Sequence, residues 1–163
     1  MSPQATPKLD PDSLLAARAA RLAARGGAAA RAEAGEEVLV CDCAGERYGL
    51  PVAGVAEVLP ARPCTPIPGA PAALVGIAAL SGGVVSVLDL AAALGRPSPG
   101  ERPGTGHFVA LRGGAAPVVL RVDRVLGLAR ATGADAASGY VPADGREDFV
   151  LVDLARLLRR FRP

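Results

Sequence analysis

Three aspartates are the residues of this chain best able to do chemistry as a group. Asp89 and Asp153 each follow an apolar run and precede a short Leu- and Ala-rich segment, and Asp123 lies inside an apolar run. Paired carboxylates can act as general acid and base. The same context suits N-capping, because an Asp at a helix start accepts hydrogen bonds from the free N–H groups of the first turn. We expect two N-caps at Asp89 and Asp153, and a bond from Asp123 to neighbouring backbone or Arg124. A small carboxylate-dependent enzyme is the alternative.

The cysteines and the single histidine form no pattern for a metal site or a catalytic thiol. Cys41 and Cys43 are two residues apart, so on a strand they face the same side. They supply two ligands, whereas zinc normally takes four, or three and a water. His107 has no ligand-spaced companion, and nothing in the sequence brings Cys64 to it. We therefore expect core or surface cysteines, reduced thiols, a cytoplasmic location, and neither metal nor cofactor.

Glycine pairs and C-terminal arginines complete the set of candidate ligand-binding residues. Gly82-Gly83 and Gly113-Gly114 lack the Lys-Ser/Thr that follows a phosphate loop, so we interpret them as hairpin turns. Four arginines lie on the predicted last helix, where cations suit the negative end of the helix dipole. Both a solvated helix end and a ligand site stay open for them. They are Arg156, Arg159, Arg160 and Arg162.

Length and composition limit the class of protein. The chain has 163 residues, 50% of them hydrophobic, which is enough for one domain with a core of Leu and Val. Its net charge is +2 and its aromatic content 3%. Nucleic-acid binders usually carry a concentrated basic excess and stacking aromatics, so we expect no nucleic-acid partner. No apolar run approaches the ~18 residues of a membrane-spanning helix, so we expect no direct membrane insertion.

The elements around these residues are a helix and then a succession of strands. Residues 1–35 are an extension, in which Asp10-Pro11 opens an amphipathic helix over about 11–25 with leucines on one face. We expect this helix to contact a partner surface, because alone it would fray; a solvated extension is the alternative. From residue 36 onward the pattern predicts three hairpins. Their strands are 38–43 and 47–52, 75–80 and 84–88, and 108–112 and 117–122, and loops are expected at 63–71, 95–106 and 131–148.

Two pairs of segments repeat each other along the chain. Residues 87–94 match residues 151–158 position by position, and residues 52–58 pair with 122–128 at a similar offset. Such an internal repeat indicates two related units. We predict two related β units in one body, each containing a strand that ends in Asp and starts a short helix.

Seven short blocks occur in a fixed order over some 125 residues. They are GERYGLPV (45–52), VAEV (55–58), TPIPGAP (65–71), VGI (75–77), VVSVLDL (84–90), VDRVLGL (122–128) and LVDLARLL (151–158). Together these blocks resemble the CheW-type adaptor domains of bacterial chemosensory signalling. Each block is weak alone, and the order and spacing carry the resemblance.

The resemblance implies an all-β fold with short helices: two small SH3-like β-barrel subdomains that share a hydrophobic core. The domain would span residues 36–163, after the N-terminal amphipathic helix. The implied function is a non-enzymatic scaffold that couples a chemotaxis-type histidine kinase, through its regulatory domain, to the cytoplasmic tip of methyl-accepting receptors. The implied location is cytoplasmic, in receptor arrays. Because 35 residues cannot hold a receiver or kinase module, we expect a stand-alone adaptor.

The resemblance also implies five partner-binding positions. Val55, Glu57, Gly76 and Gly82 match the family's functional region, while Ser81 stands where the family usually has Arg. Other roles stay open: Val55 can belong to the core, the two glycines can serve backbone geometry, and Glu57 can be a solvated strand charge. The missing Arg at position 81 keeps a divergent protein, without kinase or receptor coupling, as a second hypothesis.

Overall fold

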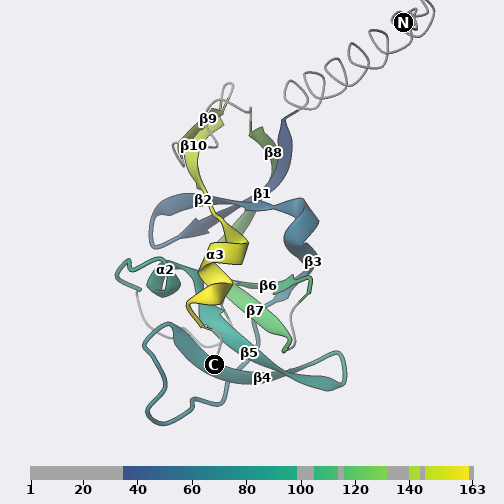
Figure 1. Ribbon diagram of the computed structural model, residues 1–163, viewed down its shortest axis with the longest axis vertical. Coiled ribbons are helices and arrows are strands. Elements are labelled where there is room, and N and C mark those ends of the chain that lie inside the picture. The colour runs from purple at the N-terminus through teal and green to yellow at the C-terminus, as the bar shows by residue number, and fades with distance from the viewer. Residues whose placement is uncertain (1–34, 99–104, 114–115, 132–139, 144–145, 162–163) are drawn as a thin grey trace, which may run out of the picture. The chain divides into compact units, whose positions relative to one another are not determined.

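From Glu36 onward the chain is a succession of short strands, as the alternation of apolar residues predicts (Figure 1). The computed structural model describes residues 35–98, 105–113, 116–131, 140–143 and 146–161. Within these residues the strands form two five-stranded sheets. The helix predicted over about 11–25 lies outside the described residues.

The first sheet has the strand order β8-β1-β2-β10-β9, and the second has the order β3-β6-β7-β5-β4. Three short helices join or follow strands. The strands of the first sheet are β1 (Glu36–Cys43), β2 (Glu46–Pro51), β8 (Arg124–Ala131), β9 (Tyr140–Ala143) and β10 (Arg146–Leu151). Those of the second are β3 (Val55–Pro60), β4 (Leu74–Leu80), β5 (Gly83–Asp89), β6 (His107–Leu111) and β7 (Val118–Val122). The helices are the 3-10 turn η1 (Val52–Gly54), α2 (Leu90–Ala93) and α3 (Leu154–Arg159).

The two sheets share one plan, which confirms the predicted pair of related β units. Each has a central antiparallel hairpin, β1-β2 or β6-β7, with an antiparallel edge strand, β8 or β3, on one side. On the other side β10 or β5 pairs in parallel with the hairpin, and β9 or β4 follows it antiparallel. The chain crosses from the first sheet to the second at η1 and returns at Asp123, so each crossing strand forms the edge of the other unit.

A hydrophobic core shared by the two sheets joins the units. Side chains from β1 and β2 meet side chains from β5, β6 and β7 there, and α2 and α3 cover it. Each sheet also encloses a small cluster of its own, because β1 and β5 are apolar on both faces. The all-β fold of two subdomains around one core is confirmed. The buried members of the shared core are Leu39, Cys41, Cys43, Tyr48, Leu50, Ala73, Leu88, Leu90, Ala91, Ala93, Val109, Leu120, Val122, Val152 and Leu157.

A small polar cluster at the edge of the shared core links the units. The Tyr48 hydroxyl donates to Glu46 Oε2 at 2.5 Å, and Arg96, just after α2, pairs with Glu46 Oε1 at 3.2 Å. Because both charged side chains are about half exposed, the ion pair contributes little stability, on the order of 0–1 kcal/mol. Its main effect is to fix the end of the β1-β2 hairpin against the segment after α2.

The predicted hairpins are confirmed, with tight turns at two of them. Ala44-Gly45 has φ of 55° and 80°, and Ser81-Gly82 has φ of 49° and 81°. Positive φ at both central residues is the signature of type I′ turns, whose twist suits a hairpin. The prediction of a loop over 131–148 is wrong in part, because β9 and the beginning of β10 lie within this range. Proline and glycine occur in this part of the sequence, and the two strands pair with each other over only a few residues.

Candidate protein-interaction site

Two of the five implied positions lie on β3, at an edge of the second sheet. Val55 is half-buried and packs against the shared core, and its carbonyl accepts a hydrogen bond from Arg112 Nε at 2.7 Å. Glu57 is exposed, and its carboxylate makes no hydrogen bond or ion pair with the described residues. The structure therefore gives Val55 a packing role and leaves Glu57 available to a partner.

Gly76 lies on β4, at the opposite edge of the second sheet. It is buried, its φ is +153°, and a Cβ placed on it would overlap the carbonyl of Thr65. The chain after β3 pairs with β4 at this point: the Thr65 N–H donates to the Ile77 carbonyl at 2.8 Å, and the Ile77 N–H to the Thr65 carbonyl at 2.9 Å. Gly76 thus permits the close approach that brings this segment onto β4.

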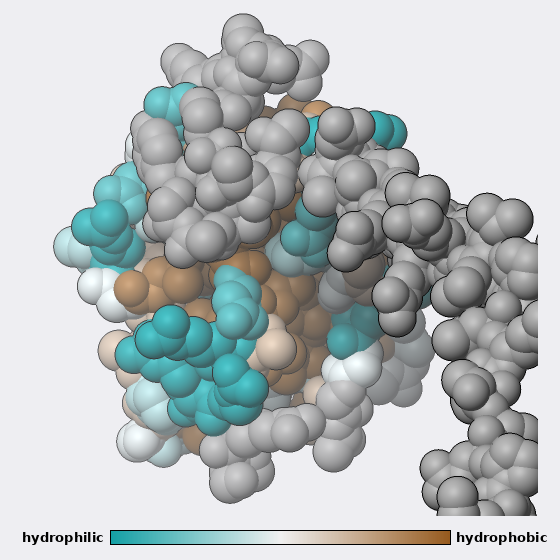
Figure 2. All heavy atoms as spheres, turned by 45° about the horizontal axis from the view of Figure 1, so that its top comes forward, coloured by the Kyte–Doolittle hydropathy of each residue, from teal (hydrophilic) through white to brown (hydrophobic). Residues whose placement is uncertain are grey.

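Ser81 and Gly82 form the exposed turn between β4 and β5. Nothing lies within 4 Å of a Cβ placed on Gly82, so its positive φ alone explains glycine there. Val84, two residues after Gly82, is 64% exposed. The turn is therefore a protruding feature with an apolar side chain beside it. Figure 2 shows hydrophobic surface between hydrophilic side chains on one face of the molecule.

The five positions form two groups on the same sheet. Val55 and Glu57 lie on the β3 edge, whereas Gly76, Ser81 and Gly82 lie on β4 and its turn. After β3 the chain passes to the opposite edge of the sheet, where Thr65 pairs with Ile77 of β4. Both groups belong to the second sheet and none to the first.

The carboxylates of Asp89 and Asp153 accept hydrogen bonds from backbone N–H groups in the first turn of a helix, which confirms the two predicted N-caps. Asp89 Oδ1 accepts from the Ala92 N–H at 2.9 Å, and its Oδ2 accepts from the Ser98 hydroxyl at 3.0 Å. Asp153 Oδ1 accepts from the Arg156 N–H at 2.9 Å.

Asp123 bonds to backbone, as expected, but this backbone is distant in the sequence and belongs to neither of its chain neighbours. Its Oδ2 accepts from the Ala44 N–H at 2.7 Å, in the turn of the β1-β2 hairpin and 79 residues away in sequence. The crossing of the chain at Asp123 places it there, a long-range arrangement with no local signal. The carboxylate holds the Ala44 turn to the point where β7 passes into β8.

The thiols of Cys41 and Cys43 lie in the shared core and are poor nucleophiles. Burial raises the pKa of Cys41 to about 12. Burial raises the pKa of Cys43 as well; a backbone hydrogen bond from Asp123 offsets part of this rise, and the charges of Cys41, Asp123 and Asp89 add to it. Cys64 is half-buried, and its thiol is directed to the Arg62 carbonyl at 3.5 Å. Among the described residues no three His, Cys, Asp or Glu side chains gather to hold a metal ion.

We predict that the protein loses stability in mild alkali. The folded pKa values of Cys41 and Tyr48 are about 12, above the ordinary values of 9.0 and 10.0, because burial disfavours their charged forms and Glu46 adds to this at Tyr48. The contribution of these groups to the free energy of unfolding is complete at pH values below their unfolded-state pKa values. It is lost as the pH rises toward their folded-state pKa values. Urea midpoints should be level to about pH 8 and fall progressively above pH 9.

The matched variant for this prediction is Cys41→Val, which removes one buried acid and keeps a similar volume. It should flatten the decline between about pH 9 and 11. A urea midpoint in the unaltered protein that stays constant over that range would contradict the assignment of these thiols to the core.

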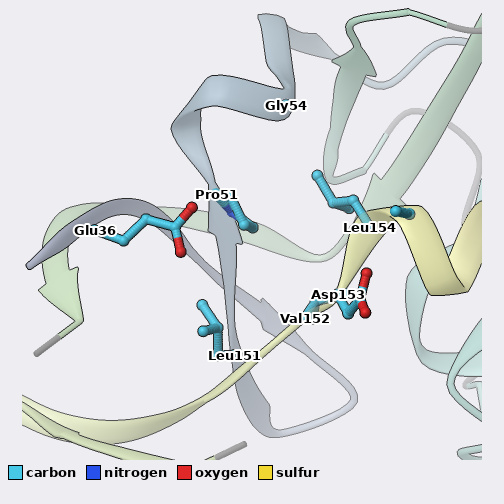
Figure 3. A pocket seen from close by; sticks show the side chains of 8 residues that line it. Glu36, Pro51, Gly54, Leu151, Val152, Asp153 and Leu154 are labelled. Carbon is cyan, nitrogen blue, oxygen red and sulfur yellow. The ribbon is translucent and has the colours of Figure 1, made fainter. Parts of the chain in front are cut away.

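An open groove of about 390 Å³ lies where α3 begins (Figure 3). Pro51, Leu151 and Leu154 supply apolar side chains from β2, β10 and α3, and Glu36 reaches the groove from the start of β1. A Cβ on Gly54 would lie 2.6 Å from Leu154 Cδ1, so glycine leaves room for the Leu154 side chain in the groove. A concave apolar surface bordered by a few charges is what a partner's apolar side chains require.

Sequence reasoning did not find this groove. Its lining comes from residues 36, 51 and 54 and from residues 151–155, about a hundred positions later, and the two groups meet only because β10 pairs with β2. The repeat at 151–158 marked one wall, but no local pattern marked the other.

Within the described part of the chain, no helix is long and apolar enough to cross a membrane.

Two related β units around one core, with an exposed turn, an available edge carboxylate and an apolar groove, define a protein-interaction domain. The family model described as CheW-like domain matches residues 37–160. Protein FrzA of Myxococcus xanthus is 33% identical over 142 residues, which cover 78% of this chain and 88% of FrzA. The chain therefore belongs to the CheW-like domain family, and it is a CheW-like adaptor domain.

A solved structure supports the fold independently. The scaffolding protein TtCheW from Thermoanaerobacter tengcongensis matches with a TM-score of 0.62 at 21% identity, covering 76% of this chain and 92% of that one. At this identity the match concerns the fold alone.

Proposed function

We propose that this protein is a scaffold that couples a chemotaxis-type histidine kinase to methyl-accepting receptors in a bacterial chemosensory array, on the cytoplasmic side. The observation that carries the proposal is the CheW-like family match over residues 37–160. The capping roles of Asp89 and Asp153 support a non-enzymatic reading, because both carboxylates are occupied by backbone N–H groups.

We assign residues 36–163 to the CheW-like domain and residues 1–35 to an N-terminal extension whose predicted helix contacts a partner. The regulatory domain of the kinase would meet the second sheet, at Glu57 on β3 and at the turn formed by Ser81 and Gly82. Exposed sheet edges favour such a partner because strands bind by adding to an edge. The receptor would occupy the groove beside α3, where apolar side chains are open to solvent.

Ser81 favours a second candidate, a divergent CheW-fold interaction protein that has lost its coupling to the kinase or to the receptor. Its hydroxyl sits at an exposed turn position where the family usually carries a guanidinium, which could form bidentate hydrogen bonds to a partner carboxylate. Serine cannot supply a charge-assisted contact of this kind. The candidate therefore predicts reduced affinity for one partner and unchanged affinity for the other.

We predict that Ser81→Arg raises the affinity for the kinase regulatory domain or for a receptor cytoplasmic fragment by about tenfold, the effect of one charge-assisted hydrogen bond. The fold should tolerate the change, because the side chain at 81 is exposed and both residues carry the same positive-φ cost. Isothermal titration of each partner measures the affinities, with Ser81→Gln as the uncharged control.

The wild-type titrations in the same series test the proposal itself. Binding of both partners at micromolar concentration supports the scaffold. Absence of binding to both overturns it. If both affinities are the same for Ser81→Arg and wild type, Ser81 does not explain divergence and the second candidate is rejected.

A further inference from the structure

The exposed face of α3 carries three arginines, which we call the basic strip: Arg156, Arg159 and Arg160. They are spaced i, i+3 and i+4 and so lie on one side of the helix. All three are exposed. The opposite side holds the helix in place, because Leu157 is buried in the shared core and Leu154 and Phe161 pack against it. The guanidinium groups are therefore held toward solvent by the packing of α3.

Among the described residues, no acidic side chain forms an ion pair with the basic strip. The one aspartate beside it, Asp153, directs Oδ1 to the backbone N–H of Arg156 and so caps the helix. Arg156 and Arg159 lie in the last turn of α3 and Arg160 is its C-cap, where cations suit the negative end of the helix dipole. This dipole effect is small, about 0.3–1 kcal/mol. Three guanidiniums held together on a chain of net charge +2 favour an external anionic partner.

The basic strip adjoins the apolar groove. Leu154 and Ala155 of α3 line the groove. Arg159 is four residues after Ala155, so it lies one turn further along the same side of the helix. The opposite end of the groove carries the Glu36 carboxylate. The surface thus runs from an acidic end at Glu36, over a mainly apolar middle that also holds the capping carboxylate of Asp153, to a basic end.

We propose that the groove and the basic strip form one docking surface for an amphipathic segment of a partner protein whose apolar stripe is flanked by Asp and Glu. The apolar stripe fills the groove, and the carboxylates meet the arginines, whose planar donors bind carboxylates bidentately. Glu36 at the far end disfavours acidic residues there, so the charge asymmetry also sets the direction of the segment. The inference rests on the proposed function, which assigns the receptor to this groove.

The test uses the full chain and two labelled helical peptides that share one leucine stripe at i, i+3, i+4 and i+7 spacing. One peptide flanks the stripe with glutamates and the other with lysines. Fluorescence anisotropy should show the glutamate peptide binding about tenfold more tightly at ~50 mM salt, and screening should remove most of the gap at ~500 mM. The triple variant Arg156→Gln, Arg159→Gln, Arg160→Gln should lose the preference.

A control is the double variant Arg62→Gln, Arg124→Gln, which removes two exposed arginines that lie outside α3 and should keep the preference. Leu154→Asp should weaken both peptides, because it places a charge in the groove. Circular dichroism of each variant checks that the fold is retained. Equal binding of the two peptides, a preference that survives the triple variant, or tighter binding of duplex DNA than of the glutamate peptide would overturn the proposal.

Failure here is distinguishable from failure of the proposed function. If wild type binds kinase and receptor fragments but shows no peptide preference, the docking surface is wrong and the scaffold stands. If the preference is present but neither fragment binds, the surface stands for another acidic partner and the scaffold function is wrong.

Discussion

Gly76→Ala is expected to destabilise the protein by about 3 kcal/mol, more than any other single methyl group added at the implied partner-binding positions. The Cβ would overlap the Thr65 carbonyl oxygen and lie 2.7 Å from its carbon, and φ at Gly76 is +153°. Both neighbours are backbone, so no side chain can move aside. The two hydrogen bonds between Thr65 and Ile77 should break. Urea unfolding followed by circular dichroism measures the loss.

The control for this prediction is Gly82→Ala in the exposed turn. Its φ of +81° disfavours alanine, but nothing lies within 4 Å of the new Cβ. The expected cost is about 1–2 kcal/mol, from backbone strain alone. Similar losses in the two variants would contradict a role for Gly76 in the close approach of the Thr65 segment. Partner binding by refolded Gly82→Ala then reports on the turn as a contact.

Leu50→Ala should lower the free energy of unfolding by about 2–5 kcal/mol and weaken both β units at once. Leu50 is on β2 in the first sheet and is fully buried in the core shared with the second. A cavity there removes contacts from both sheets. The protein should therefore still unfold in one transition, with a lower urea midpoint.

Hydrogen exchange separates this outcome from local damage. Amides of β6 and β7, in the second sheet, should exchange faster in Leu50→Ala by about the same free energy as those of β1. Leu120→Ala, which empties the same core from β7, should in turn accelerate exchange in the first sheet. Loss of protection confined to the mutated sheet would show that the two units are independently stable.

Features with a local cause could be predicted from the sequence. The turns at Ala44-Gly45 and Ser81-Gly82 follow from glycine between alternating apolar residues, and the caps at Asp89 and Asp153 from the position of Asp before a short helix. The repeat at 87–94 and 151–158 anticipated the two units, since both copies encode a strand that pairs in parallel and then starts a helix.

Features that depend on distant pairing could not be predicted. The exchange of β3 and β8 between the sheets leaves no local mark, because each crossing takes only one to a few residues. The Asp123 carboxylate reaches Ala44 only through that crossing. The groove joins Pro51 to Leu154 across the parallel pair of β2 and β10. Glycine and proline in and around β9 and β10 favour a loop, so the sequence pattern did not predict these two strands.

The interaction positions gained a division of roles from the structure. Val55 packs against the core, Gly76 permits the close approach of the Thr65 segment, and Gly82 has the positive φ of its turn, so three of the five positions have structural causes. Glu57 and Ser81 remain as exposed side chains that can contact a partner directly. For the arginines of the basic strip the sequence left two roles open, a solvated helix end and a ligand site. The groove beside them is the reason that we propose the second role.

The central claim is that this chain bridges two partners, and one measurement tests it directly. A kinase regulatory domain, a receptor cytoplasmic fragment and this protein are mixed at micromolar concentration and analysed by size-exclusion chromatography with light scattering. Kinase and receptor should elute in one complex only when this protein is present, with a mass that contains all three. Separate elution of kinase and receptor fragments in the presence of the folded protein would contradict the scaffold function.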